Sequence, residues 1–317
     1  MEKNERGFTK QIYGVIFILL WSSLTLAGEW SLVWSDEFDY TGPPNEEKWN
    51  YEQGFVRNQE LQYYTKARKE NARVENGHLI IEARKEDWLN PDYRADESSG
   101  RWQRSREKAD YTSASLITKD KASWTYGRIE VKAKLPAGRG VWPAIWMLGT
   151  NIGQVGWPKC GEIDIMEYVG FDPNTVYANV HMAKYNHVKG TGKGSKIKAD
   201  KPYASFHTYA IEWTPEKMDF FFDENKYFTF ENEHGGVDAW PFDQPHYLIL
   251  NLAIGGSWGG QKCPSINLWS LRQRMRSPCF LLYPIGCVYS AGAFRIRSYR
   301  RSLFAWIGVL TYLLPSL

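Results

Sequence analysis

Three acidic side chains lie within six residues of an otherwise apolar segment, and their spacing could support acid and base chemistry. The stretch GEIDIMEYVG begins at Gly161 and carries Glu162, Asp164 and Glu167 among isoleucine, methionine and valine residues. Carboxyl groups held close together repel one another, which raises the pKa of at least one of them. Such a group can hold a proton for general acid catalysis while its neighbour stays ionised.

The third acid is out of step with a regular strand. Successive side chains of a strand point to opposite faces, so Glu162 and Asp164 share one face while Glu167 would point to the other. A β-bulge at Ile165 or Met166 would insert one extra residue and return Glu167 to the face of the other two acids. We therefore predict a bulged strand with all three acids in one cleft. The alternative is a half-exposed strand with a solvated acidic face.

The composition narrows the class of protein. The chain has 317 residues, 43% of them hydrophobic, and its 15 Trp are numerous enough to serve as platforms for flat ligands such as sugar rings as well as core residues. The net charge of +3 argues against an extended basic surface for nucleic acid, and no zinc-finger spacing or phosphate-binding loop occurs. The six His show no ligand spacing, so we expect no catalytic metal and no cofactor for catalysis.

Short runs of β-branched and aromatic residues follow one another from about residue 29, separated by turn residues. Examples are GHLIIEARK, YGRIEVKAKLP and FHTYAIEWTP, and the stretch MDFFFDENKYFTF is typical of a hairpin. No run of ten residues before position 260 has helical periodicity. The pattern predicts an all-β sandwich or barrel.

The two ends of the chain differ from the region between them. Residues 1–27 combine a charged start, an apolar run and small residues up to Ala27, which is typical of a secretory signal peptide; a signal anchor is the alternative. Residues 263–317 contain no Asp, Glu or Lys but hold seven Arg and three of the four Cys. The apolar end of this tail is too short for a membrane span. We expect a secreted, extracellular protein with no stable membrane span.

Aromatic residues near the acids suggest a sugar-binding surface. The stretch GVWPAIWMLG places Trp142 and Trp146 on one face of a strand, where two rings could form the floor of a cleft; core packing is the alternative. The stretch NVHMA offers His181. The glycine-rich stretch GGSWGG offers Trp258, whose large ring among flexible residues is hard to explain by packing.

Taken together, these stretches resemble glycoside hydrolase family 16, and specifically its laminarinase-like endo-β-1,3-glucanases. The matching stretches keep the family's order between Ser35 and Gly260 and are SDEFDY, NQELQYYT, YTSASLITK, YGRIEVKAKLP, GVWPAIWMLG, GEIDIMEYVG and LNLAIGGSWGG. The E-x-D-x-x-E pattern with its extra residue is specific for the bulged branch of the family.

The resemblance implies a β-jelly-roll sandwich with a concave substrate cleft. It assigns Glu162 as the nucleophile and Glu167 as the general acid/base, with Asp164 between them. The implied reaction is retaining endo-hydrolysis of β-1,3-glucosidic bonds in laminarin-like glucans by double displacement, by a protein that is expected to be a monomer. The resemblance also suggests which residues line the sugar subsites, namely Asn58, Trp142, Trp146, His181, Asn251 and Trp258.

Three alternatives remain at this stage: a mixed-linkage β-glucanase, a galactan hydrolase of the same family, and a non-catalytic β-glucan recognition protein. The tail departs from the family, whose members continue into an acidic stretch and a final strand. We therefore predict a catalytic domain over residues 28–262 that lacks its last strand, followed by a misframed or misspliced tail that lowers stability. Many relatives bind a structural calcium ion through an Asp of that strand and groups near the N-terminus, so the resemblance implies a structural calcium site that the missing strand leaves incomplete.

Overall fold

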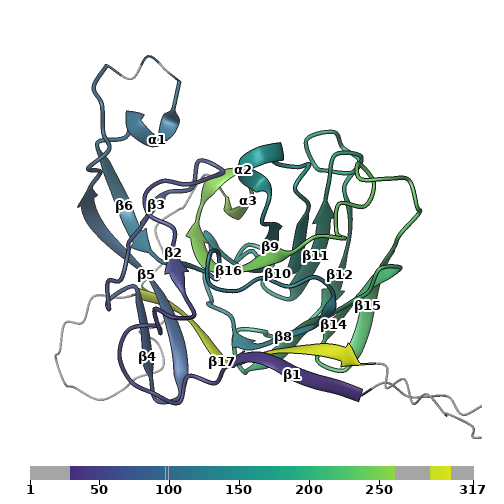
Figure 1. Ribbon diagram of the computed structural model, residues 1–317. Coiled ribbons are helices and arrows are strands. Elements are labelled where there is room, and N and C mark those ends of the chain that lie inside the picture. The colour runs from purple at the N-terminus through teal and green to yellow at the C-terminus, as the bar shows by residue number, and fades with distance from the viewer. Residues whose placement is uncertain (1–28, 97, 99, 261–285, 301–317) are drawn as a thin grey trace, which may run out of the picture. The chain divides into compact units, whose positions relative to one another are not determined.

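The alternating segments form two packed β-sheets in the computed structural model (Figure 1). The structure describes residues 29–96, 98, 100–260 and 286–300. Within those residues, ten strands form the larger sheet and seven antiparallel strands form the smaller one. The predicted all-β sandwich of the jelly-roll type is confirmed.

Neighbours in the strand order of each sheet are hydrogen-bonded to each other. The larger sheet has the order β15-β14-β13-β8-β17-β5-β6-β3, with β1 against β17 and β4 against β5, and consists of β1 (Glu29–Asp36), β3 (Gln62–Tyr64), β4 (Ala72–Glu75), β5 (His78–Leu89), β6 (Lys108–Ser113), β8 (Gly127–Lys134), β13 (His207–Trp213), β14 (Lys217–Phe222), β15 (Asn225–Glu231) and β17 (Gly286–Arg300). The smaller sheet has the order β12-β11-β10-β9-β16-β7-β2 and consists of β2 (Asn50–Tyr51), β7 (Ser115–Ile117), β9 (Val141–Gly149), β10 (Glu162–Glu167), β11 (Thr175–His181), β12 (Lys193–Lys198) and β16 (His246–Ile254). The described helices are α1 (Trp102–Ser105), α2 (Ile152–Val155) and α3 (Gly256–Gly259).

The main core lies between the sheets and is built from the inward half of each alternating strand. In β8, Ile129 and Val131 are fully buried, whereas Arg128 and Glu130 form an ion pair of 3.0 Å on the outer face. In the smaller sheet, β9 and β16 are buried along their whole length. One face of these two strands packs in the core, and side chains on the other face line the cleft described below.

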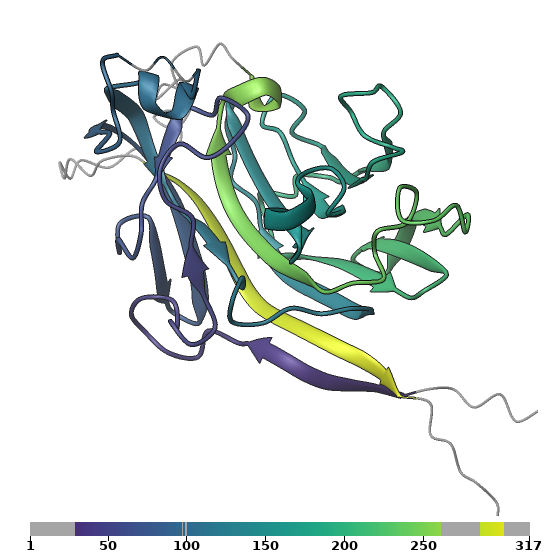
Figure 2. The same cartoon turned by 45° about the horizontal axis from the view of Figure 1, so that its top comes forward.

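The tail contributes a strand to the larger sheet, so the prediction of a domain that ends at residue 262 without its last strand is wrong. Residues 286–291 of β17 pair with β5, and residues 290–297 pair with β8. Both views show β17 in yellow running beside β1 (Figures 1 and 2). The compact unit that contains the sandwich extends from Trp30 to Tyr299.

A bulge explains why the sequence pattern does not reveal this strand. The register shifts between Ala291 and Ala293, which interrupts the alternation that identifies a strand. After the shift the alternation is regular, because Phe294 and Ile296 are buried while Arg295 is exposed and pairs with Glu37 at 2.9 Å. The origin of the tail in another frame or a misjoined exon stays a prediction.

Other expectations at the ends of the chain fall outside the described residues. The predicted signal peptide, residues 1–27, and the tail segments 263–285 and 301–317 belong to this group. Among the residues that the structure describes, no helix has both the length and the apolar character needed to cross a membrane.

Candidate active site

Strand β10 carries the predicted bulge. Against β9, Ile165 is the extra residue, because the register shifts between Asp164 and Met166. The pairing with β11 shifts at the same place. Ile165 and Met166 are both fully buried in the core, and this double inward step returns Glu167 to the cleft face that the other two acids share.

The three acids open into a cavity of about 730 Å³. All six residues suggested as subsite residues line this cavity together with the acids, namely Asn58, Trp142, Trp146, His181, Asn251 and Trp258. They come from β9, β11, β16, α3 and the loop before β3, so the sandwich gathers segments that are far apart in sequence. Their contact with substrate stays a prediction.

Each outer acid of the cluster accepts hydrogen bonds from aromatic or amide donors. The Trp157 Nε1–H donates to Glu162 Oε2 at 2.8 Å. The Trp142 Nε1–H donates to Glu167 Oε1 at 3.1 Å, and the Asn179 Nδ2–H donates to Glu167 Oε2 at 2.8 Å. Hydrogen bonds of this kind stabilise the ionised carboxylates and fix their orientation.

Burial raises the pKa of all three acids, and repulsion between their charges adds to the rise for Glu162 and Asp164. Burial raises the pKa of Glu162 to about 7, and the charge of Glu167 adds to the rise. Burial also raises the pKa of Glu167, although its hydrogen bonds to Asn179 and Trp142 oppose this. The pKa of Asp164 is raised well above its usual range by burial and by the charges of the other two acids. The cluster can therefore both donate and accept a proton near neutral pH.

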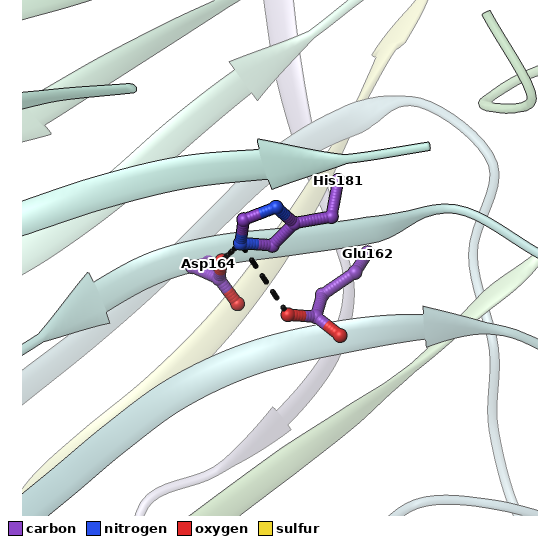
Figure 3. A group of neighbouring side chains, drawn as sticks. All are labelled: Glu162, Asp164 and His181. Carbon is purple, nitrogen blue, oxygen red and sulfur yellow. Dashed lines mark ion pairs between the residues drawn. The ribbon is translucent and has the colours of Figure 1, made fainter. Parts of the chain in front are cut away.

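His181 stands directly opposite Glu162 in the ladder between β10 and β11. Its Nε2 lies 3.4 Å from Asp164 Oδ2 and 3.8 Å from Glu162 Oε1 (Figure 3). Burial and the nearby His187 lower the pKa of His181 to about 4. The imidazole is therefore neutral near neutral pH.

The aromatic wall at one end of the cavity consists of three rings. Trp258 packs edge-on against Trp142 at 5.5 Å and against Tyr177 at 5.0 Å. The turn that carries Trp258 needs glycine, because Gly256 has a φ of +74° and a Cβ there would lie 3.0 Å from the Asn58 backbone oxygen. The close approach of two loops thus positions the ring.

A hydrogen-bonded chain holds the other tryptophan. The Trp146 Nε1–H donates to Asn251 Oδ1 at 2.7 Å, and the Asn251 Nδ2–H donates to Tyr64 Oη at 2.9 Å. Tyr64 in turn donates to the buried Glu60 at 3.1 Å. The Arg57 guanidinium lies over the Trp146 ring at 4.8 Å from its centre, and this cation–π contact also holds the ring in place.

The residues of the site that the sequence pattern does not reveal include Trp157, Asn179 and Arg57. A signal existed for Asn179, since it precedes His181 by two positions and so shares its strand face. Trp157 belongs to the loop between α2 and β10, and Arg57 to the loop before β3, where no periodicity indicates which way a side chain points.

The residues present can be compared with the needs of two kinds of metal site, one at the acid cluster and one for structural calcium. Glu162, Asp164 and His181 place one ligand atom each within 4.8 Å of one another (Figure 3). The calcium site implied by the resemblance does not fit, because β17 contains no Asp or Glu and Glu37 near the N-terminal strand is paired with Arg295.

Comparisons with known proteins agree with this geometry. The model of the glycosyl hydrolases family 16 matches residues 59–269. The chain is 51% identical over 245 residues to a beta-glucanase of Rhodothermus marinus, covering 74% of this chain and 79% of that protein. It is 38% identical over 245 residues to a glucan endo-1,3-beta-glucosidase of Cryptopygus antarcticus, covering 74% of this chain and 83% of that protein.

Solved structures of laminarinases also match the fold of this chain. The laminarinase of Rhodothermus marinus superposes with a TM-score of 0.72 at 44% identity, covering 87% of this chain and all of that one. The laminarinase catalytic domain of Thermotoga maritima superposes with a TM-score of 0.71 at 36% identity, covering 86% of this chain and all of that one. With the bulged acid strand and the aromatic cavity, these matches show that the chain belongs to the glycosyl hydrolases family 16 and is a glycoside hydrolase.

Proposed function

We propose that the protein hydrolyses internal β-1,3-glucosidic bonds of laminarin-like glucans with retention of anomeric configuration. The observation that carries this proposal is the bulge in β10, which places two glutamates and an aspartate on one face of a single strand inside an aromatic cavity. Retaining glycosidases need two carboxyl groups close enough for one to attack while the other protonates the leaving group.

Glu162 is the nucleophile in this proposal. Its carboxylate attacks the anomeric carbon of the sugar while Glu167 donates its proton to the glycosidic oxygen, so that the bond to the leaving chain breaks as the covalent bond forms. The indole of Trp157 holds Glu162 in place at 2.8 Å. Burial and the neighbouring charges raise the pKa of Asp164 well above its usual range, which favours its protonated form, and its hydrogen bond to Glu162 lowers the pKa of the nucleophile.

Glu167 changes role in the second half of the reaction. After the leaving chain departs, the Glu167 carboxylate removes a proton from water, which attacks the anomeric carbon and releases Glu162. The Trp142 and Asn179 donors stabilise this ionised state. Trp142, Trp146 and Trp258 would then provide the faces against which sugar rings pack.

Chemical rescue tests the two roles separately. Glu162→Ala should lower laminarin hydrolysis by about a thousandfold or more, and added azide should restore turnover with a glycosyl azide of inverted, α configuration as product. Azide should instead give the β product with Glu167→Ala. Glu130→Gln is the matched control, since it removes a carboxylate from the outer face of the larger sheet. Full activity of Glu162→Ala without azide would refute the proposal.

Linkage preference is part of the proposal and has its own test. The relatives named above include a glucan endo-1,3-beta-glucosidase and laminarinases, and this supports β-1,3-glucan over mixed-linkage glucan or galactan. The products from laminarin, lichenan and agarose should be compared by chromatography. Binding of laminarin without any cleavage would favour a recognition protein instead.

We propose that the protein is exported and acts as a monomer. The charged and apolar order of residues 1–27 supports export. Mass spectrometry of the secreted protein should show an N-terminus at Gly28, and light scattering should give the mass of one chain. An intact Met1 on a membrane-attached protein would indicate a signal anchor.

A further inference from the structure

The side chains of Glu162, Asp164 and His181 form a compact group whose positions are set by two rigid strands. Glu162 and His181 are direct partners in the antiparallel ladder between β10 and β11. Asp164 lies two residues along β10, on the same face as Glu162. Figure 3 shows the imidazole pointing between the two carboxyl groups.

The separations of the polar atoms suit a small cation. His181 Nε2 lies 3.4 Å from Asp164 Oδ2 and 3.8 Å from Glu162 Oε1. A tetrahedral zinc ion with ligands at about 2.0–2.2 Å requires its ligand atoms to be about 3.4 Å apart. One ion could therefore reach all three side chains after small side-chain adjustments.

The atoms that face one another have free lone pairs. Asp164 is 3% exposed, and its Oδ2 has no hydrogen-bond partner. Glu162 receives the Trp157 donor on Oε2, which leaves Oε1 on the side of His181. His181 Nδ1 also lacks a partner, so the ring proton can reside there and leave the Nε2 lone pair for a ligand bond.

We propose that Glu162, Asp164 and His181 bind a divalent transition-metal ion of the zinc type, and that this ion inhibits the enzyme by occupying the nucleophile. One imidazole and two carboxylates are ligands that zinc accepts, whereas calcium and magnesium prefer a full set of oxygens. Carboxyl groups bind a metal in their ionised form, so the ion displaces to solvent the protons that burial favours on Asp164 and Glu162. The cavity leaves the fourth position to water. Binding does not depend on the proposed function; the inhibition does, because it rests on Glu162 as nucleophile.

The surroundings of His181 favour reversible binding. Imidazole ligands in permanent zinc sites usually donate their other N–H to a carboxylate or carbonyl, and loss of that partner weakens binding by roughly 10–100-fold. The His181 Nδ1 has no such acceptor. The ion therefore acts as a removable inhibitor that competes with substrate for the same atoms.

Calorimetric titration of the full protein with ZnCl₂ at neutral pH tests binding without reference to activity. We expect one site that His181→Ala and Glu162→Gln each weaken at least tenfold. His187→Ala is the matched control, because its ring lies 5.1 Å from His181 but outside the ligand set, and it should bind zinc within twofold of wild type. CaCl₂ should give no binding at this site.

Kinetics on laminarin complete the test. Zinc should raise the apparent KM and leave kcat unchanged, and a chelator should reverse the effect. Equal zinc affinity in wild type and His181→Ala would place the ion elsewhere, for example at the surface pair of His207 and Asp223, and would overturn the proposal. Zinc bound at the site without slower hydrolysis would overturn the inhibitory role. If wild type hydrolyses no glucan, the proposed function fails while the titration still decides whether the metal site exists.

Discussion

Removing the indole N–H of Trp157 directly tests whether Glu162 is the nucleophile and Glu167 the general acid/base. Trp157→Phe keeps an aromatic ring but removes the donor 2.8 Å from Glu162 Oε2. The ionised form of Glu162 loses that stabilisation, so the pKa of Glu162 rises above its present value of about 7. Because the nucleophile must be ionised, the acidic limb of the kcat/KM profile should move to higher pH.

The size of the shift follows from the strength of the bond. A hydrogen bond to a charged group contributes about 1.5–3 kcal/mol, and one pKa unit corresponds to about 1.4 kcal/mol. The Trp157 side chain is partly exposed, so water replaces part of the lost interaction. We therefore expect the lower end of the range, a shift of about one pH unit.

The assay measures kcat/KM on laminarin from pH 4 to 10 in the presence of a chelator. Trp142→Phe is the matched variant, because it removes an equivalent indole donor from Glu167. It should move the alkaline limb upward, where the general acid loses its proton, and leave the acidic limb in place. If Trp157→Phe moves the alkaline limb instead, the roles of the two glutamates are reversed.

Further outcomes concern stability and substrate affinity. Phe294→Ala should cost about 3–5 kcal/mol of unfolding free energy in urea, since the ring is fully buried, while Arg295→Ala on the exposed face of β17 should cost less than about 1 kcal/mol. His246 is fully buried and its pKa is lowered to about 4, so the unfolded chain binds the proton more readily than the folded protein. The free energy of unfolding should therefore fall by about 3 kcal/mol as the pH drops from about 6.5 to 4. In urea titrations, His246→Gln should make the free energy of unfolding less dependent on pH over that range. Trp258→Ala should raise KM for laminarin about tenfold with a smaller change in kcat, because the ring packs on Trp142 and makes no hydrogen bond to the acids.

The bulge in the acid-bearing strand β10 could be predicted from the sequence because the irregular spacing of its acids lies within a few residues. Five positions separate Glu162 from Glu167, and only a bulge reconciles that number with a shared face. The contacts of Trp157 and Arg57 depend instead on how loops fold back over the sheet. Side-chain direction in a loop has no periodicity, so no spacing in the sequence indicated that Trp157 reaches Glu162.

In the tail, a β-bulge hides a strand from sequence-based prediction, whereas in β10 the spacing of the acids reveals the bulge. A bulge between Ala291 and Ala293 breaks the alternation of β17, so the sequence pattern does not reveal the strand and predicts a domain boundary that is too early. The expected loss of stability rested on a missing strand, and β17 lies between β5 and β8 with Phe294 fully buried. The urea titration of Phe294→Ala decides whether this strand stabilises the folded protein: a change below about 1 kcal/mol would show that it does not.

Core packing and catalysis depend on the same residues of β10. Ile165 and Met166 are both fully buried, and their consecutive inward positions are what turn Glu167 toward the cavity. Any change that lets the strand return to regular alternation would expose one of these apolar side chains or withdraw the acid from the cleft. Burial of the carboxyl groups is unfavourable on its own, but the dense core on the opposite face of the strand holds them there. The raised pKa values that acid catalysis requires are therefore a consequence of how the core packs.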